Sequence, residues 1–240
     1  MIGTKYILTT QLISKLDIYL SKTVGLEKLF RLGQYVSKFI YLYNGFPFAG
    51  QLMGHFMFLF KSITTLKYFS FLQQVIKAEE TFNCWSLIAW MNLFKCYSLL
   101  LWKLFDLPMV LQLYDIILLA PVLAKKCQKV ANYCWLSSLL WAVAIELSCF
   151  FTYERDILST RRILQNIKHK KDSILQSVKL KQLRAYYNKR KIILRKIILT
   201  TLDVIVVLKL LNLINRYDLL ITFFGVVTSV EGVKDVWDSC

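Results

Sequence analysis

Residues 133–153 read YCWLSSLLWAVAIELSCFFTY. This stretch is 21 residues long, has a tyrosine at each end and carries one charge, Glu146. A helix needs about 20 predominantly apolar residues to cross the hydrocarbon core of a bilayer, and aromatic side chains are enriched at both interfaces. The stretch therefore predicts a membrane-spanning helix.

The sequence around this span lacks the residues that punctuate a β-fold. No glycine occurs between Gly54 and Gly225, and the only prolines are Pro47, Pro108 and Pro121. Hairpins between strands would need Gly, Asn or Asp turns throughout that stretch. Hydrophobic residues make up 56% of the chain, above the roughly 45–50% of a soluble domain. These features predict an all-α fold, a membrane-associated helical bundle.

Upstream of the span, residues 1–80 are predicted to form amphipathic helices. One is expected at Thr4–Ser21, a second at Leu26–Tyr43 and a third at Gln51–Lys77, with a break at Asn44–Pro47. In the second helix the apolar arc is Leu26, Leu29, Phe30, Val36 and Ile40, and the polar arc is Glu27, Lys28, Arg31, Gln34 and Lys38. In the third, the apolar arc contains Leu52, Phe56, Leu59 and Ile63. Such arcs predict helices that insert into a membrane surface or pack on a neighbouring helix.

Three further regions complete the predicted organisation. Residues 81–153 form an apolar helical region that includes the span at 133–153. A competing candidate span in the same region is Trp85–Leu107, which is aromatic-rich but carries Lys95, Lys103 and Asp106. Residues 154–196 hold 14 Lys or Arg against three acidic residues, a net of +11 out of the chain's +16, and predict one basic amphipathic helix. Residues 197–240 predict a helical hairpin that is a second candidate span, although Asp203 and Lys209 lie in its first arm.

The positive charge has two natural partners, nucleic acid and an anionic membrane. Apolar helices flank the basic segment and no nucleic-acid-binding motif is present, which favours membrane lipids over nucleic acid. Each basic residue near an anionic leaflet contributes about 1 kcal/mol, while a merely solvated face would contribute nothing. Basic clusters alternate with aliphatic triplets in 189–199, as in sites bound by a membrane-protein import receptor. Its basic residues are Lys189, Arg190, Lys191, Arg195 and Lys196.

Catalytic and metal-binding chemistry finds no support in the sequence. It contains no Gly-rich phosphate loop, H-E-x-x-H or G-x-S-x-G motif, and no C-x-x-C pair among its six cysteines. The two histidines, His55 and His169, are far apart. We therefore expect free thiols, no metal, no cofactor and no enzymatic activity. The N-terminal residues do not resemble a secretory signal.

Three blocks in series resemble the peroxin eleven family. The first is Gly25–Tyr35, the second starts at Asn132–Leu136, and the third is Gly225–Gly232 followed by Trp237. Their order and spacing match the family over nearly the whole chain. The residues that carry the resemblance are Gly25, Glu27, Gln34, Tyr35, Trp135, Gly225, Thr228, Ser229, Gly232 and Trp237.

The resemblance implies a peroxisomal membrane protein that elongates the membrane before fission and controls peroxisome number and size. It also implies self-association and binding to the import receptor and the fission machinery. An alternative is a pore for small metabolites, in which Glu146, Asp203 and Lys209 would face a wet lumen; Glu146 could equally pair with another helix. A third hypothesis is a passive adaptor that only recruits other proteins.

Overall fold

The computed structural model describes residues 22–170, 173–214 and 216–239. These residues form α-helices with no strand among them, which confirms the predicted all-α fold. The helices are α2 (Thr23–Asn44), α3 (Pro47–Leu66), α4 (Tyr68–Glu80), α5 (Leu87–Leu113), α6 (Pro121–Lys170), α7 (Ser173–Leu210) and α8 (Asp218–Asp238). The helix expected at Thr4–Ser21 lies outside the described residues.

The turn between α2 and α3 forms where the sequence predicts it. Gly45 adopts a left-handed φ of 64° and its N–H donates to the Tyr41 carbonyl at 2.9 Å, a common end of a helix. Pro47 then occupies the first position of α3, where its missing N–H costs nothing. The two helices therefore fold back on each other.

The single helix predicted at Gln51–Lys77 is wrong, because α3 ends at Leu66 and α4 begins at Tyr68. The hydroxyls of Thr64 and Thr65 both donate to the Lys61 carbonyl, at 3.0 and 2.9 Å. Bonds of this kind compete with the helical ladder and bend it. The helical period of the sequence continues through this point without Gly or Pro, so it did not reveal the break.

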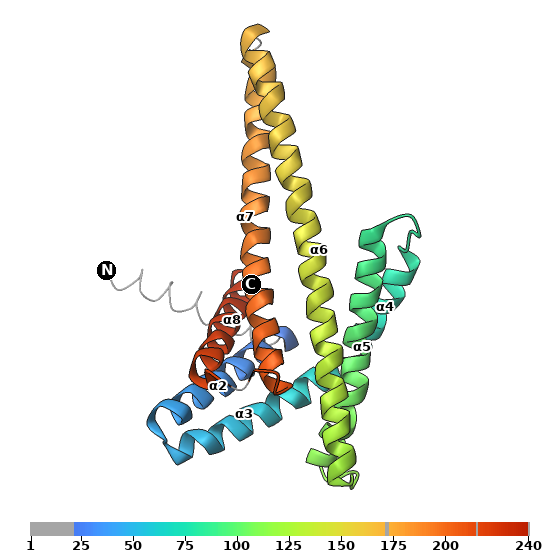
Figure 1. Cartoon of the computed structure of the whole chain (residues 1–240), viewed down its shortest axis with the longest axis vertical. Coiled ribbons are helices and arrows are strands. Elements are labelled where there is room, and N and C mark those ends of the chain that lie inside the picture. The colour runs from blue at the N-terminus through green and yellow to red at the C-terminus, as the bar shows by residue number, and fades with distance from the viewer. Residues whose placement is uncertain (1–21, 171–172, 215, 240) are drawn as a thin grey trace, which may run out of the picture.

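Six helices contact one another in a closed circuit (Figure 1). Following the chain, α2 packs on α3, α3 on α5, α5 on α6, α6 on α7, and α7 on α8. The circuit closes because α8 packs on α2, while α4 lies outside it against α5. The first and last described helices are thereby joined.

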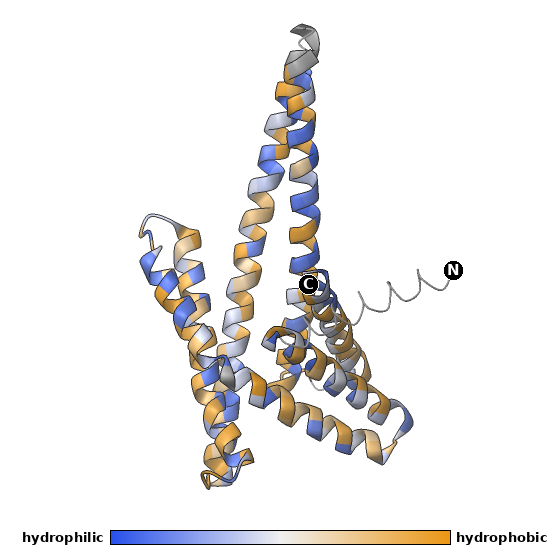
Figure 2. Ribbon diagram, turned by 180° about the vertical axis from the view of Figure 1, so that it is seen from behind, coloured by the Kyte–Doolittle hydropathy of each residue, from blue (hydrophilic) through white to orange (hydrophobic). Residues whose placement is uncertain are grey.

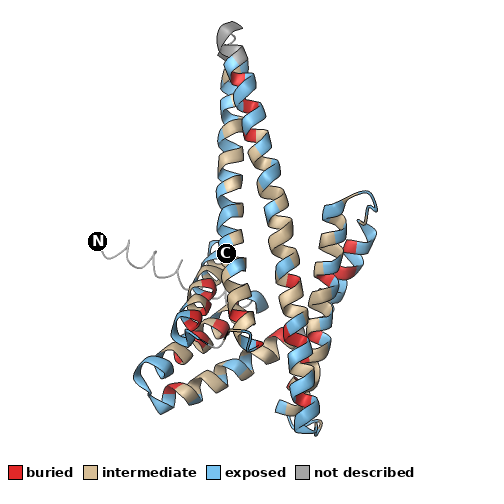
Figure 3. Ribbon diagram, in the orientation of Figure 1, coloured by how far each residue is buried: buried red, intermediate tan, exposed pale blue. Residues whose placement is uncertain are grey.

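Two of the described helices, α5 and α6, are long and apolar enough to cross a bilayer. The predicted span 133–153 lies within α6, and Ser138 is its only buried residue. In Figure 3 most of the α6 ribbon is coloured as exposed or intermediate. Its apolar surface is therefore left open to lipid. The other helix of this kind is α5. The C-terminal hairpin, formed by the end of α7 and by α8, carries the ion-paired residues Asp203 and Lys209, and its role as a second span stays a prediction.

The basic segment 154–196 does not form one helix as predicted. It is divided between the end of α6 and the beginning of α7, which pack side by side in opposite directions. With 50 residues, α6 is about 75 Å long, and with its partner it extends beyond the rest of the molecule as an arm (Figures 1 and 2). Buried Ile157 and Leu164 contribute to the contact. Helical periodicity continues on both sides of the reversal, so it could not show where the chain turns.

Candidate functional site

The apolar arc of α2 faces away from the protein. Leu29, Val36 and Ile40 are 39%, 38% and 39% exposed, while Leu26 and Phe30 are half-buried. An amphipathic helix of a soluble protein turns this arc into the core. A contiguous exposed apolar stripe instead marks a surface that contacts a membrane or another protein.

The opposite, polar side of α2 packs against the other helices. Arg31 is only 8% exposed, Tyr35 and Ser37 are buried, and Lys28 and Lys38 are half-buried. Burial lowers the pKa of Lys28, and neighbouring Arg31 lowers it further. Burial favours the neutral form of Tyr35 as well, and for a phenol this raises the pKa, so Tyr35 stays neutral at physiological pH. The helix thus buries Arg31 of its polar arc and leaves Leu29, Val36 and Ile40 of its apolar arc exposed, the reverse of what a soluble protein would favour.

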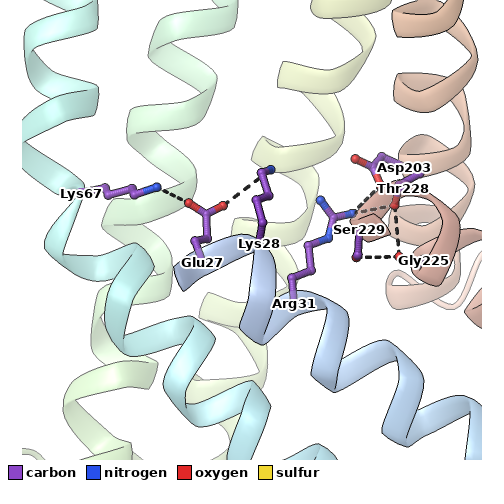
Figure 4. Close-up of polar contacts among 8 residues, drawn as sticks. All are labelled: Glu27, Lys28, Arg31, Lys67, Asp203, Gly225, Thr228 and Ser229. Atoms are coloured by element: carbon purple, nitrogen blue, oxygen red, sulfur yellow. Dashed lines mark hydrogen bonds and ion pairs between the residues drawn. The ribbon is translucent and has the colours of Figure 1, made fainter. Parts of the chain in front are cut away.

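A buried ion pair holds α2 against the C-terminal helices (Figure 4). The Arg31 guanidinium donates to Asp203 of α7 and, at 3.3 Å, to the Thr228 hydroxyl of α8. Burial lowers the pKa of Arg31, but the attraction of the Asp203 carboxylate more than offsets this effect. The pKa of Arg31 is therefore raised, and the guanidinium stays charged. The hydroxyls of Thr228 and Ser229 donate in turn to the Gly225 carbonyl, at 3.3 and 2.6 Å. Three helices meet at this one charged pair.

Two glycines of α8 allow α2 to approach closely. A Cβ atom added to Gly225 would lie 2.5 Å from the Tyr35 ring, and one added to Gly232 would lie 3.0 Å from Cδ of Lys28. The first distance is far below van der Waals contact, so glycine is required at position 225. Tyr35 of the first motif and Gly225, Thr228 and Gly232 of the third are therefore contact residues of the α2–α8 interface.

A second ion pair attaches the start of α2 to the junction of α3 and α4 (Figure 4). The Glu27 carboxylate accepts from the Lys67 ammonium and also lies 3.9 Å from Lys28 Nζ. Lys67 is the residue at which α3 gives way to α4. The acidic residue of the first motif thus stabilises the position of α2 relative to α3.

The apolar arc predicted for α3 is largely used within the protein. Leu52, Phe56 and Ile63 are half-buried, and the Phe56 ring lies 6.3 Å from that of Phe30. Leu59 remains 39% exposed. Of the two helices, α2 therefore presents the more open apolar arc.

Trp135 is a predicted site residue that lies in a different contact. Trp135 stacks on Trp102 of α5, with centroids 5.0 Å apart and planes at 9°. Gly25 is buried, Gln34 is half-buried, and Trp237 is half-buried near the end of α8. Trp135 thus belongs to the α5–α6 contact.

The predicted targeting residues divide into two groups. Lys189, Lys191 and Lys196 are exposed on α7. By contrast, Arg190 pairs with Glu154 of α6 at 3.0 Å, and Arg195 pairs with Glu231 and, at 3.0 Å, Asp235 of α8. The three lysines make no ion pair among the described residues, and the Lys189 ammonium lies 5.7 Å from the centroid of the Tyr153 ring of α6.

Sequence reasoning missed the two partners that complete the α2 site, Asp203 and Lys67. A charge inside an apolar helix is costly unless it is paired, and this signal singled out Asp203 without showing its partner. A second polar group was missed between α3 and α5, where Asp106 lies 3.4 Å from Lys61 and 3.7 Å from Lys103. From the sequence, Lys103 and Asp106 were interpreted only as charges within the candidate span Trp85–Leu107.

The residues proposed to line a pore are engaged by neighbouring helices instead. Thr200 of α7 donates to the Glu146 carboxylate at 3.2 Å. Asp203 is paired with Arg31, and Lys209 with Asp218. Glu146 therefore pairs with another helix, as the alternative to a pore-lining role predicted. The pore is not favoured.

The chain is similar to known proteins over nearly its whole length. Residues 13–237 match the family described as Peroxisomal biogenesis factor 11 (PEX11). The peroxisomal membrane protein PMP27 of Saccharomyces cerevisiae (strain ATCC 204508 / S288c) is 26% identical over 223 residues, covering 91% of this chain and 92% of the relative. No solved structure matches the chain significantly. The resemblance seen in the three sequence blocks is confirmed: the chain belongs to the PEX11 family of peroxisomal biogenesis factors.

Proposed function

We propose that this peroxisomal membrane protein elongates the membrane before fission by inserting the outward apolar face of α2 into one leaflet. The peroxisomal membrane and a role in peroxisome proliferation and division follow from the family and the yeast relative. The observation that supports the mechanism is the inversion of α2, with Leu29, Val36 and Ile40 open and Arg31 buried.

The free energy gained on inserting each apolar side chain into the bilayer is small, and these contributions add along the helix. Complete burial of a large apolar side chain stabilises by about 1.5–3 kcal/mol, so a residue with about two fifths still exposed gains roughly 1 kcal/mol. A helix half-buried at the headgroup level expands one leaflet relative to the other. That imbalance favours positive curvature, and several copies close together would increase it.

The two ion pairs fix the position of α2, so that the helix could act as a wedge, a rigid element that displaces lipid on one side of the bilayer. Arg31–Asp203 and Glu27–Lys67 join α2 to α7 and to the α3–α4 junction. The helix is therefore already folded and oriented before it meets the bilayer, which lowers the ordering cost of insertion. The displacement of lipid would be transmitted to the helices that span or abut the membrane.

The remaining partner proposals follow from the resemblance. Self-association would concentrate the wedges, the exposed lysines of α7 would bind the import receptor, and the fission machinery would sever the elongated membrane. The protein would act by binding and deforming lipid, without catalysing a reaction.

The test places charges in the open face of α2. Leu29→Glu with Val36→Glu should abolish peroxisome elongation on overproduction, because each carboxylate would enter the apolar leaflet. Both positions are exposed in the fold, so the helix bundle should form. Peroxisome length by fluorescence microscopy is the measurement, with protein level and location determined in parallel.

The matched control is Leu158→Glu with Val178→Glu, two exposed aliphatic residues in the arm of α6 and α7. These changes add the same charge away from α2 and should leave elongation intact. If the α2 variant is stable, correctly located and still elongates peroxisomes, the wedge cannot be α2. The exposed side of α3 around Leu59 would then be tested in the same way.

A further inference from the structure

The closed circuit of helices surrounds a cavity that the proposed membrane insertion does not use. Its volume is about 130 Å³, room for several water molecules and so for a group the size of a phosphate. Each of the six helices of the circuit contributes to its wall. A ligand here would contact every helix of the circuit.

Positive charge dominates the polar part of the wall. Arg31, Lys38, Lys61 and Lys209 line the cavity, with Asp106 as the only carboxylate in the lining. Arg31, Lys61 and Lys209 each have an acidic partner. For Lys38, no carboxylate of the described residues lies within ion-pair distance. Burial lowers the pKa of Lys38, an effect that Asp218 opposes and Lys209 reinforces.

The charges around the cavity do not balance. Lys103, which is 3% exposed, shares Asp106 with Lys61, and its ammonium has no hydrogen-bond partner among the described residues. The cations are Arg31, Lys38, Lys61, Lys103 and Lys209, and their acidic partners are Asp106, Asp203 and Asp218. These groups carry an excess of two positive charges, and beyond Asp106 the Lys103 ammonium has, in the described part of the chain, only the Trp102 ring, whose centroid lies 3.8 Å away. Such an excess disfavours the folded state unless an anion neutralises it.

The rest of the wall has two kinds of surface. Gln34, Gln128 and Asn132 supply amide donors, and Trp135, Met57 and Phe60 supply apolar area. A phosphate monoester carries about −1.5 to −2 charges at pH 7 and accepts several hydrogen bonds. We propose that this cavity binds a phosphate monoester group, either the headgroup of an anionic lipid such as phosphatidic acid or free phosphate. The site is separate from the outward face of α2, so it stands whether or not α2 bends membranes.

The experiment measures binding to the full-length protein in neutral detergent micelles by isothermal titration calorimetry. The probes are dihexanoyl phosphatidic acid, inorganic phosphate and, as the control with a zwitterionic, net-neutral phosphodiester headgroup, dihexanoyl phosphatidylcholine. Binding of phosphatidic acid alone identifies a lipid-headgroup site, and binding of inorganic phosphate as well identifies a site for the anion itself. Inorganic phosphate alone identifies a site for the free anion. Binding of neither phosphate probe, or equal binding of phosphatidylcholine, overturns the proposal.

The variants locate the site. Lys38→Gln should weaken binding by about tenfold or more, because a charge-assisted contact is lost. Lys38→Arg should retain it, and Gln128→Leu should weaken it through an independent donor. Lys191→Gln, an exposed lysine of α7, is the matched control and should bind as the original protein does. If Lys38→Gln and Gln128→Leu keep their melting temperature and bind unchanged, the cavity is not the binding site.

Discussion

Arg31 belongs to the polar arc that the sequence predicts for α2, and the structure makes it the residue on which three helices converge. Its guanidinium is buried, charged and shared between Asp203 and Thr228. A buried pair of this kind contributes little net stability relative to apolar residues, yet removing one partner leaves an uncompensated charge. It therefore acts chiefly to fix the position of α2.

Arg31→Ala should lower the free energy of unfolding by roughly 1–3 kcal/mol, since the half-buried Asp203 would lose its charged partner. Arg31→Met combined with Asp203→Leu should recover most of this loss. Denaturant titration in micelles, followed by circular dichroism, provides the measurement. Arg155→Ala on the exposed side of α6 is the control. Equal stability of the single and double variants would show that the pair is not coupled.

Gly225 offers a second test at a single position. Gly225→Ala would place a methyl group 2.5 Å from the Tyr35 ring and should destabilise by roughly 1–3 kcal/mol through overpacking. Gly54→Ala on α3 meets nothing within 4 Å and should stabilise by up to about 1 kcal/mol through helix propensity. Opposite shifts in melting temperature are expected. Shifts in the same direction would contradict the close α2–α8 contact.

At the level of whole helices, α7 uses its charges in two ways. Arg190 and Arg195 connect it to α6 and α8, while the neighbouring lysines remain exposed. An address read by a receptor must be accessible, whereas an interhelical pair is already occupied. The targeting proposal therefore rests on the lysines alone.

Replacing Lys189, Lys191 and Lys196 together by Ser should reduce the fraction of tagged protein that colocalises with a peroxisomal marker. The bundle should stay intact, because these lysines carry no interhelical ion pair in the described structure. The cation–π contact of Lys189 with Tyr153 of α6, at 5.7 Å, is worth about 0.5–1 kcal/mol at an exposed site. Arg190→Ser with Arg195→Ser should instead lower the melting temperature and leave targeting largely unchanged. Normal location of the triple lysine variant would exclude this segment as the address.

On the scale of the molecule, α6 is continuous from its start at Pro121 to its end at Lys170. It contains no proline or glycine after Pro121 and so no residue that commonly kinks a helix. If residues 133–153 cross the bilayer, the loop before α6 and the arm after it must lie on opposite faces of the membrane. The arm, with its excess of basic residues, then projects away from the bilayer.

This topology can be measured with single cysteines in a cysteine-free background. Asp115→Cys reports on the loop before α6 and Ser159→Cys on the arm, and both positions are exposed. A membrane-impermeant maleimide added to intact peroxisomes should label one of the two and reach the other only after permeabilisation. Labelling of both without permeabilisation would contradict a membrane-crossing α6.

Much of the helical content and one candidate span could be predicted from the sequence, because both depend on local residue type and period. The turn at Gly45–Pro47 and the stretch 133–153 are of this kind. The break at Lys67 and the reversal within 154–196 could not be predicted, since helical periodicity continues across both. Neither carries the Gly or Pro that normally marks a helix end.

The candidate site shows the same division. Periodicity identified the two arcs of α2, but not which of them faces outward, because a bilayer can accept the apolar arc as readily as a protein core can. That choice came from Arg31, whose partners lie 172 and 197 residues further along the chain. Pairing a charge across such a separation depends on how α7 and α8 return to α2, and this is a property of three-dimensional packing. Once Arg31 is paired inside, the helical period leaves Leu29 and Val36 on the outside.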